Sequence, residues 1–205
     1  MLIRKNQRKV KFERKSTETE IIAELNLDGK GSANVKTGIG ILDHMLELFA
    51  FHGLFDLKME VKKADTEIDI HHTNEDIGIV LGKIFKKALG DMNGIKRFGF
   101  AAAPMESTFS EVILDIGGRG YLKLDLQGAS GTKIQDGYAL TYLEHFLESF
   151  ANNLGANLVV NVNNVSEDLH TTLETAFKAL GLALCDAVRI ESRRGGVPST
   201  KGIID

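Results

Sequence analysis

The amino-acid sequence predicts an α+β protein built from two copies of one strand–helix–strand–helix unit. Three observations support this prediction. A His-x-x-x-Glu motif occurs twice, over residues 71–75 and 170–174. Each copy opens a stretch with the same helical apolar stripe, and each follows strands that flank a glycine-rich turn. We expect residues 1–95 and 96–205 to form the two halves of one compact protomer, with helices packed on mainly antiparallel sheets.

Strands are expected on both sides of two glycine turns. In the first half, apolar and polar residues alternate over residues 20–36 around such a turn. In the second half, the same alternation runs over residues 112–126. Residues 55–61 and 158–162 also alternate, which is typical of strands half-buried in a sheet.

Two helices are expected in each half. Residues 40–52 and 140–151 have helical spacing, and Gly53 follows the first of them as a C-terminal stop. The longer helices carry apolar stripes that a shift of 99 residues superimposes: Ile77, Val80, Leu81, Ile84, Phe85 and Ala88 against Ala176, Ala179, Leu180, Ala183, Leu184 and Ala187. The second half is therefore expected to repeat the first.

The composition excludes several classes of protein. A formal net charge of −3 gives no signature of polyanion binding, so we expect no nucleic-acid partner. No apolar run approaches the length of a membrane helix, and the basic start has no apolar stretch behind it. The single cysteine, Cys185, lies in an apolar run and is expected to be a buried structural thiol. We therefore expect a soluble cytoplasmic protein without membrane contact.

Histidines occupy corresponding places in the two halves. Five of the six lie in or shortly before the two motifs: His44, His71, His72, His145 and His170. Residues four apart share one face of a helix, so each motif brings an imidazole beside a carboxylate. This ligand set suits Mn, Fe, Ni or Zn, and the absence of cysteine partners argues against a structural zinc site. One motif alone could be an ordinary surface helix start, but two matched copies favour a metal site.

The residues around the motifs add two details. Asp69 and Asp168 precede the motifs and could cap the helices or orient a ligand. Thr171 stands where the first half has His72. The sixth histidine, His52, closes the helix at 40–52, where it could simply satisfy terminal carbonyls.

A basic set of residues suggests a phosphate site. Arg119 lies in a glycine turn, Arg97 in the sequence KRFG, and Lys178 four residues after Glu174. The tail carries Ser-Thr-Lys at residues 199–201. Such residues hold phosphate through charge-assisted hydrogen bonds, although each taken singly is more often a solvated surface residue.

The sequence resembles the imidazoleglycerol-phosphate dehydratases of histidine biosynthesis over essentially its whole length. The motifs that carry the resemblance occur in the family's order: TGIGILDHML, FHG, IDIHHTNEDIGIVLG, KRFGFAAAPM, GGRGYL, YLEHFLESFA, ETAFKAL and GVPSTKG. The resemblance implies a ribosomal S5 domain 2-like fold and a hydro-lyase that converts imidazole glycerol phosphate to imidazole acetol phosphate. It also implies a large homo-oligomer of about 24 subunits, with two Mn²⁺ sites per chain at subunit contacts.

Carried over by position, the resemblance implies roles for particular residues. The implied metal ligands are His44, His71, His72, Glu75, His145, His170 and Glu174. The implied catalytic residues are Glu18, His72 and Glu75, with Glu18 as the acid/base that residue patterns alone would miss. The implied substrate-binding residues are Glu18, His52, Arg97, Arg119, Lys178, Ser199, Thr200 and Lys201.

The chain also departs from the family pattern. Thr171 replaces a histidine, Asp168 an asparagine, Asn161 a histidine and Glu106 an aspartate, and the turn before Arg119 reads Gly-Gly rather than Ser-Gly. A threonine hydroxyl is a poor neutral donor for a divalent ion, so one of the two metal sites could be weak, further hydrated or empty.

Two alternative functions stay open at this point. The chain could be a non-catalytic or weakened metal-binding paralogue, but a structural shell would have no use for Glu18 and the basic set. It could also be a different metal-dependent enzyme acting on a phosphate ester, which a release of phosphate would reveal.

Overall fold

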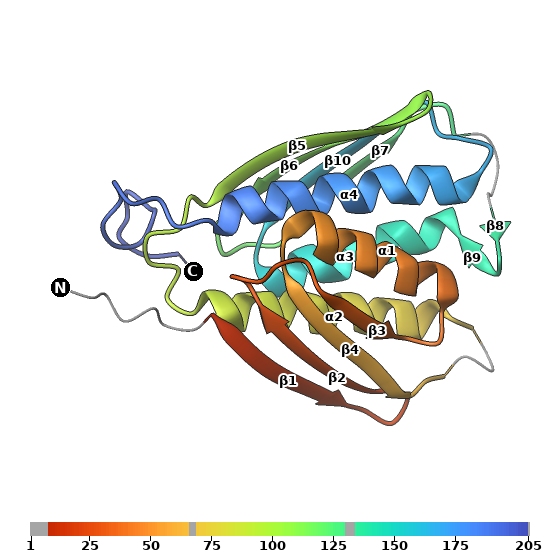
Figure 1. Cartoon of the computed structure of the whole chain (residues 1–205), viewed down its shortest axis with the longest axis horizontal. Helices are drawn as coiled ribbons and strands as arrows, with labels where there is room; N and C mark the ends of the chain where they lie inside the picture. The colour runs from red at the N-terminus through yellow and green to blue at the C-terminus, as the bar shows by residue number, and fades with distance from the viewer. Residues whose placement is uncertain (1–7, 66–68, 130–133, 205) are drawn as a thin grey trace.

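Four helices form a layer between two four-stranded sheets (Figure 1). The computed structural model describes residues 8–65, 69–129 and 134–204; residues 1–7 of the basic start lie outside them. The first sheet has the order β1-β2-β4-β3, from β1 (Lys9–Lys15), β2 (Glu20–Asn26), β3 (Ala33–Lys36) and β4 (Asp56–Lys63). The second sheet has the order β5-β6-β10-β7, from β5 (Phe98–Met105), β6 (Thr108–Asp115), β7 (Tyr121–Leu126) and β10 (Asn157–Asn163).

The two sheets have the same mixed topology, and this confirms the predicted α+β class with mainly antiparallel sheets. In each sheet two strand pairs are antiparallel and one is parallel, β3 with β4 and β7 with β10. The strands on either side of a glycine turn are not neighbours, because β4 and β10 insert between them. The outer strands β1 and β5 were not identified from the alternation in the sequence.

The helices are α1 (Gly40–Gly53), α2 (His71–Leu89), α3 (Leu140–Leu154) and α4 (Leu169–Val188), and a short hairpin of β8 (Ile134–Gln135) and β9 (Tyr138–Ala139) precedes α3. All twelve residues of the two predicted apolar stripes are buried, which confirms the predicted faces. None of the described helices has the length and apolar character needed to cross a membrane.

The prediction that Gly53 ends α1 as a stop residue is wrong. Gly53 is the last helical residue, and Leu54 takes the left-handed conformation with φ 56°. A Cβ on Gly53 would lie 2.3 Å from the Phe55 ring and 3.1 Å from the Gly181 carbonyl oxygen. Close packing, rather than backbone freedom, therefore requires glycine there.

Each closely packed pair of helices joins the two halves of the sequence. Helix α2 packs along α3, and α1 packs along α4. Gly78 and Gly82 of α2 face the carbonyl oxygens of Phe146 and Phe150, and a Cβ at either glycine would lie only 2.6 Å from its facing oxygen. Gly181 of α4 approaches the Phe49 carbonyl in the same way, at 2.5 Å. Small residues thus let the helix backbones approach closely enough for residues of both halves to meet.

Replacing Gly78 by alanine tests this packing. We expect Gly78→Ala to lower the stability by about 1–3 kcal/mol, because the added methyl group must push α2 away from α3. Urea unfolding followed by circular dichroism measures the effect. Gly40→Ala is the control, since Gly40 begins α1 with no atom within 4 Å of an added Cβ. Equal stabilities of the two variants would show that the close approach is not needed.

Candidate functional site

One candidate metal-binding group lies between α1 and α4. The α1–α4 group consists of His44, His170 and Glu174, whose potential ligand atoms all lie within 4.8 Å of one another. The Nε2 atoms of His44 and His170 lie 3.2 and 2.8 Å from Oε1 of Glu174, and the two rings are stacked. The first half of the sequence supplies one imidazole, and the second half supplies the other imidazole and the carboxylate.

Glu174 carries a negative charge that is partly neutralised by its own helix. Lys178, one turn later, donates a hydrogen bond to Oε2 of Glu174. Burial alone would raise the pKa of the Glu174 carboxyl, but hydrogen bonds from Lys178 and the two histidines outweigh burial and lower the pKa to about 2. The carboxylate is therefore ionised at neutral pH. It lies beside the imidazole nitrogens of His44 and His170, and imidazole with carboxylate is a ligand set for a divalent cation.

A second group occupies the equivalent place between α2 and α3. The α2–α3 group consists of His71, Glu75 and His145. Nε2 of His71 lies 3.6 Å from Oε2 of Glu75, and the rings of His71 and His145 are 4.4 Å apart. Among the described residues, Nδ1 of His145 is buried without a hydrogen-bond partner. Buried polar atoms are normally satisfied, so this nitrogen is free to bind a ligand such as a metal ion.

Carboxylates hold the starts of the helices that carry these groups. Asp43 accepts hydrogen bonds from the amide and hydroxyl of Thr37, which fixes the entry into α1. Asp168 caps α4 through the His170 amide, and Asp69 accepts from the His71 amide at the same distance of 3.1 Å. The capping role predicted for the two aspartates is therefore confirmed for Asp168, whereas Asp69 lies one residue before Ile70, the N-cap of α2.

A third cluster lies at the end of the first sheet, beside the first turn of α2. Glu18, Asp65 and His72 each offer a ligand atom within 4.8 Å of the others. His72 thus does not join His71 and Glu75, although it is adjacent to His71 in the sequence. The structure places Glu18 beside His72. Asp65 was missed in the sequence because it lies in a polar stretch without periodicity.

The residues of these clusters fit a first-row divalent ion. Imidazole nitrogens and a carboxylate oxygen converge between α1 and α4, and His71 pairs with Glu75 in α2; such mixed donor sets suit Mn, Fe, Ni or Zn. The partnerless His145 nitrogen supports the same assignment. Each of the two groups has three ligand residues, so an ion with a larger coordination number would need ligands from outside the group.

Most of the predicted phosphate-binding residues line one cavity of about 320 Å³. They are Arg97, Arg119, Ser199, Thr200 and Lys201, joined by Gly117, Ile203 and Ile204. Lys178 and His52 lie elsewhere: Lys178 pairs with Glu174, and burial and the charge of Lys178 lower the pKa of His52. With two arginines and a lysine on its lining, this anion pocket suits a phosphate group.

Arg97 is the structural anchor of the anion pocket. Its guanidinium makes a two-pronged ion pair with Asp115, at 2.5 and 2.9 Å, and donates to the Pro198 carbonyl at 3.0 Å. The hydrogen bonds that Arg97 donates to Asp115 raise the pKa of Arg97, so its charge is permanent. The Pro198 contact ties the Ser-Thr-Lys tail to the second sheet. Asp115 was not predicted as part of this pocket.

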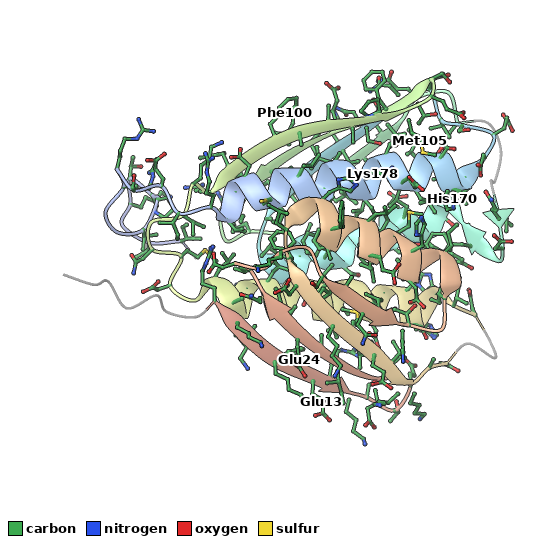
Figure 2. The ribbon with its side chains drawn as sticks, in the orientation of Figure 1. Glu13, Glu24, Phe100, Met105, His170 and Lys178 are labelled. Carbon is green, nitrogen blue, oxygen red and sulfur yellow. The ribbon has the colours of Figure 1, made fainter. Side chains whose placement is uncertain are left out.

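The anion pocket and the α1–α4 group lie at opposite ends of α4. The Arg97 amide donates to the carbonyl of Ala187, near the C-terminal end of the helix, whereas His170 lies in its first turn. Seventeen residues of helix separate the two, which corresponds to about 25 Å. Figure 2 shows His170 and Lys178 along α4, with His170 at the end away from the chain's C-terminus.

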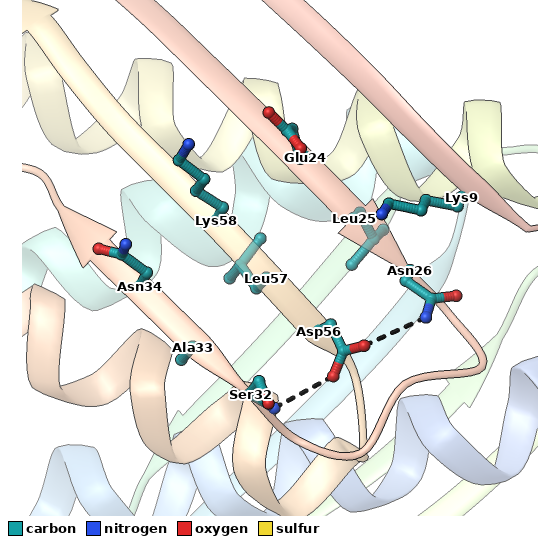
Figure 3. A pocket seen from close by; sticks show the side chains of 10 residues that line it. All are labelled: Lys9, Glu24, Leu25, Asn26, Ser32, Ala33, Asn34, Asp56, Leu57 and Lys58. Carbon is teal, nitrogen blue, oxygen red and sulfur yellow. Dashed lines mark hydrogen bonds between the residues drawn. The ribbon is translucent and has the colours of Figure 1, made fainter.

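A further hollow on the outer face of the first sheet has a structural explanation (Figure 3). Asp56 lies in it and accepts hydrogen bonds from the amides of Lys30 and Ser32 and from the side chain of Asn26. These bonds lower the pKa of Asp56 and fasten the loop between β2 and β3. Its carboxylate is thus occupied by the protein itself.

Comparison with known proteins identifies the family. The family model for imidazoleglycerol-phosphate dehydratase matches residues 37–184. The imidazoleglycerol-phosphate dehydratase of a Thermoanaerobacter species is 49% identical over 197 residues, which cover 96% of this chain and 100% of that protein. That of Methanocella arvoryzae is 47% identical, covering 93% and 96%. The chain belongs to the imidazoleglycerol-phosphate dehydratase family.

Solved structures of family members agree with the fold. The imidazoleglycerol-phosphate dehydratase crystal structure from Pyrococcus furiosus matches with a TM-score of 0.78 and 33% identity, covering 94% of this chain and 99% of that one. The crystal structure from Staphylococcus aureus matches with a TM-score of 0.74 and 27% identity, covering 89% and 100%. The predicted resemblance to the imidazoleglycerol-phosphate dehydratase family is thereby confirmed.

The departures from the imidazoleglycerol-phosphate dehydratase pattern lie in different environments. Thr171 is buried in the first turn of α4, with its hydroxyl 3.4 Å from Oδ2 of Asp168. Asn161 lies on β10, opposite Glu111 and Asp125 of the flanking strands. Thr171 and Asp168 thus adjoin the candidate α1–α4 group through His170, whereas Asn161 lies on the second sheet.

Proposed function

We propose that the chain catalyses the dehydration of imidazole glycerol phosphate to imidazole acetol phosphate, with Mn²⁺ bound by its paired histidine and glutamate residues. The convergence of two imidazoles and a carboxylate between α1 and α4 carries this proposal, together with the matching His71–Glu75 pair in α2 and the separate anion pocket. The family supports the reaction, and the donor chemistry supports the metal. A cytoplasmic location stays a prediction.

The reaction removes hydroxide from the carbon that carries the imidazole ring and a proton from the next carbon of the chain, and the resulting enol becomes the ketone. Arg97, Arg119 and Lys201 would hold the phosphate and so place the reacting carbons. Glu18 would carry the proton as the acid/base. A divalent ion, when bound, supplies a Lewis acid that draws electron density from an imidazole nitrogen of the substrate.

A second copy of the chain would complete the site. The substrate is far shorter than the distance of about 25 Å that helix geometry places between the anion pocket and the α1–α4 group of one chain. The phosphate and the imidazole of one substrate molecule cannot reach both. We therefore propose a homo-oligomer in which the pocket of one chain lies against the metal-binding residues of another. The family resemblance suggests a large assembly of about 24 subunits.

The outer faces of the two sheets support self-association. On the first sheet, one cross-strand row is Lys11, Glu24, Lys58 and Asn34, so three of its four residues are charged. On the second sheet, the corresponding row is Phe100, Ile113, Val159 and Lys123, so three of its four residues are apolar, and Phe100 is 60% exposed. Figure 2 shows Glu24 and Phe100 on the opposite sides of the molecule. An exposed apolar face of this kind favours contact with another protein surface.

The apolar face continues into the anion pocket. Phe98 is 55% exposed, and its ring lies beneath the Arg97 guanidinium, 5.0 Å from the ring centre. A copy of the chain that covers the second sheet would therefore lie beside the pocket. Because the apolar face and the pocket adjoin, we propose that a second copy of the chain covers this face.

Phe100→Glu tests the association. We expect a smaller particle than wild type in light scattering, because the new carboxylate would be desolvated in the interface. Asn34→Glu, which places the same charge on the outer face of the first sheet, should leave the particle size unchanged. An unchanged size for Phe100→Glu would exclude the second sheet as the contact surface.

Turnover of imidazole glycerol phosphate by the Mn²⁺-loaded protein tests the function itself. We expect a keto product without release of phosphate, and a loss of at least about a hundredfold in kcat for Glu18→Gln, because general acid–base catalysis typically contributes this much. Phosphate release would favour a phosphate-ester hydrolase instead. A protein that binds Mn²⁺ but turns over no substrate would favour the non-catalytic paralogue.

Thr171→His tests whether the threonine weakens one metal site. We expect the added imidazole to raise the Mn²⁺ content or affinity of the chain, because threonine is a poor neutral donor. Thr171→Val is the matched control and should leave Mn²⁺ binding unchanged. Metal analysis after dialysis measures both. If wild type already holds two tightly bound ions per chain, another group replaces the missing ligand.

A further inference from the structure

The ring nitrogen that faces a carboxylate is different in His72 from the one in three other histidines. Nε2 lies near a glutamate of the same helix pair in His44, His71 and His170. In His72 it is Nδ1, which lies 3.5 Å from Oδ2 of Asp65. A neutral imidazole protonated at Nδ1 keeps its lone pair on Nε2. An aspartate at Nδ1 therefore favours the form in which Nε2 is the free donor.

Asp65 lies in a partly buried place near the turn between β1 and β2. It follows the end of β4, and its side chain is only 25% exposed. Lys63, two residues earlier, donates to the Thr17 carbonyl, which ties the end of β4 to that turn. In the turn the Ser16 hydroxyl accepts from the amides of Glu18 and Thr19. These contacts hold the end of β4 beside the turn that carries Glu18, and Glu18 and Asp65 both lie near His72.

The internal repeat supplies an independent observation. Thr171 occupies the place of His72 in the second half. The shift of 99 residues that relates the two halves places Asn164 at the position of Asp65, just after the end of β10. Asn164 carries no carboxylate, and the acidic neighbour of Thr171 is instead Asp168, three residues before it. A carboxylate at the position of Asp65 thus occurs in the half that has the histidine and not in the half that has the threonine.

We propose that Asp65 is a positioning residue that accepts the Nδ1–H of His72 and so directs Nε2 of His72 toward a metal ion. This inference rests on the proposed metal-dependent function and deepens it. Metal-binding histidines generally donate their other ring N–H to a carboxylate, a carbonyl or water, and the loss of such a partner typically costs tenfold to a hundredfold in affinity. Asp65 thereby acts through His72 and does not touch the substrate.

Calorimetric titration of the metal-free, full-length protein with Mn²⁺ tests this role. We expect Asp65→Ala to weaken Mn²⁺ binding by about tenfold to a hundredfold. Asp65→Asn should lose less, because its amide oxygen accepts the same hydrogen bond. Glu60→Ala on β4 is the control, since the Glu60 carboxylate pairs with Lys62 rather than with a histidine. Thermal unfolding of each variant checks that the fold is retained.

A double-mutant cycle separates positioning from other roles. If Asp65 acts through His72, then Asp65→Ala has no further effect on Mn²⁺ binding in a His72→Ala background. Additive losses would show an independent role and overturn the proposal. Equal losses in Asp65→Asn and Asp65→Ala would make Asp65 a direct ligand and also overturn it. If Asp65→Ala binds Mn²⁺ as tightly as the unmodified protein, the positioning role alone is refuted. If the unmodified protein binds no Mn²⁺, the metal-dependent function is refuted together with this role.

Discussion

The close packing of helices from different halves of the sequence is the constraint on which the rest of the structure depends. Gly78 and Gly82 allow α2 to approach the backbone of α3, and Gly181 allows α4 to approach α1. A single half of the chain contains only part of each metal-binding group. The glycine contacts therefore connect packing directly to chemistry, because they bring together His44 with His170 and His71 with His145, which are 126 and 74 residues apart in the sequence.

Duplication gives the protein two similar groups but not two identical ones. The α1–α4 group has Lys178 beside its carboxylate, whereas the repeat places Ile79 at the corresponding position of α2. The first half also has His72 with Glu18 and Asp65 nearby, and the second half has the buried Thr171. A neutral residue in place of an imidazole changes the affinity for a cation, so the two groups are expected to differ in metal binding.

The two sheets have also diverged on their outer faces. Charged rows cover the first sheet, as expected of a surface in contact with water, whereas phenylalanine and isoleucine lie exposed on the second. The apolar face borders the anion pocket through the contact of Phe98 with Arg97. Assembly and substrate binding are therefore physically coupled in our proposal, because one surface serves both.

Sequence patterns were sufficient to predict the α+β class, the repeat, the apolar faces of α2 and α4 and the histidine–glutamate pairs. These features depend on the hydrophobic period and on the spacing of residues that are near one another in the chain. Only the tertiary structure decided that β4 and β10 insert between the strands of each glycine turn, and that each metal-binding group draws on both halves. It also placed Asp65 beside His72 and Asp115 beside Arg97. Contacts between distant residues depend on packing, which no local pattern in one sequence records.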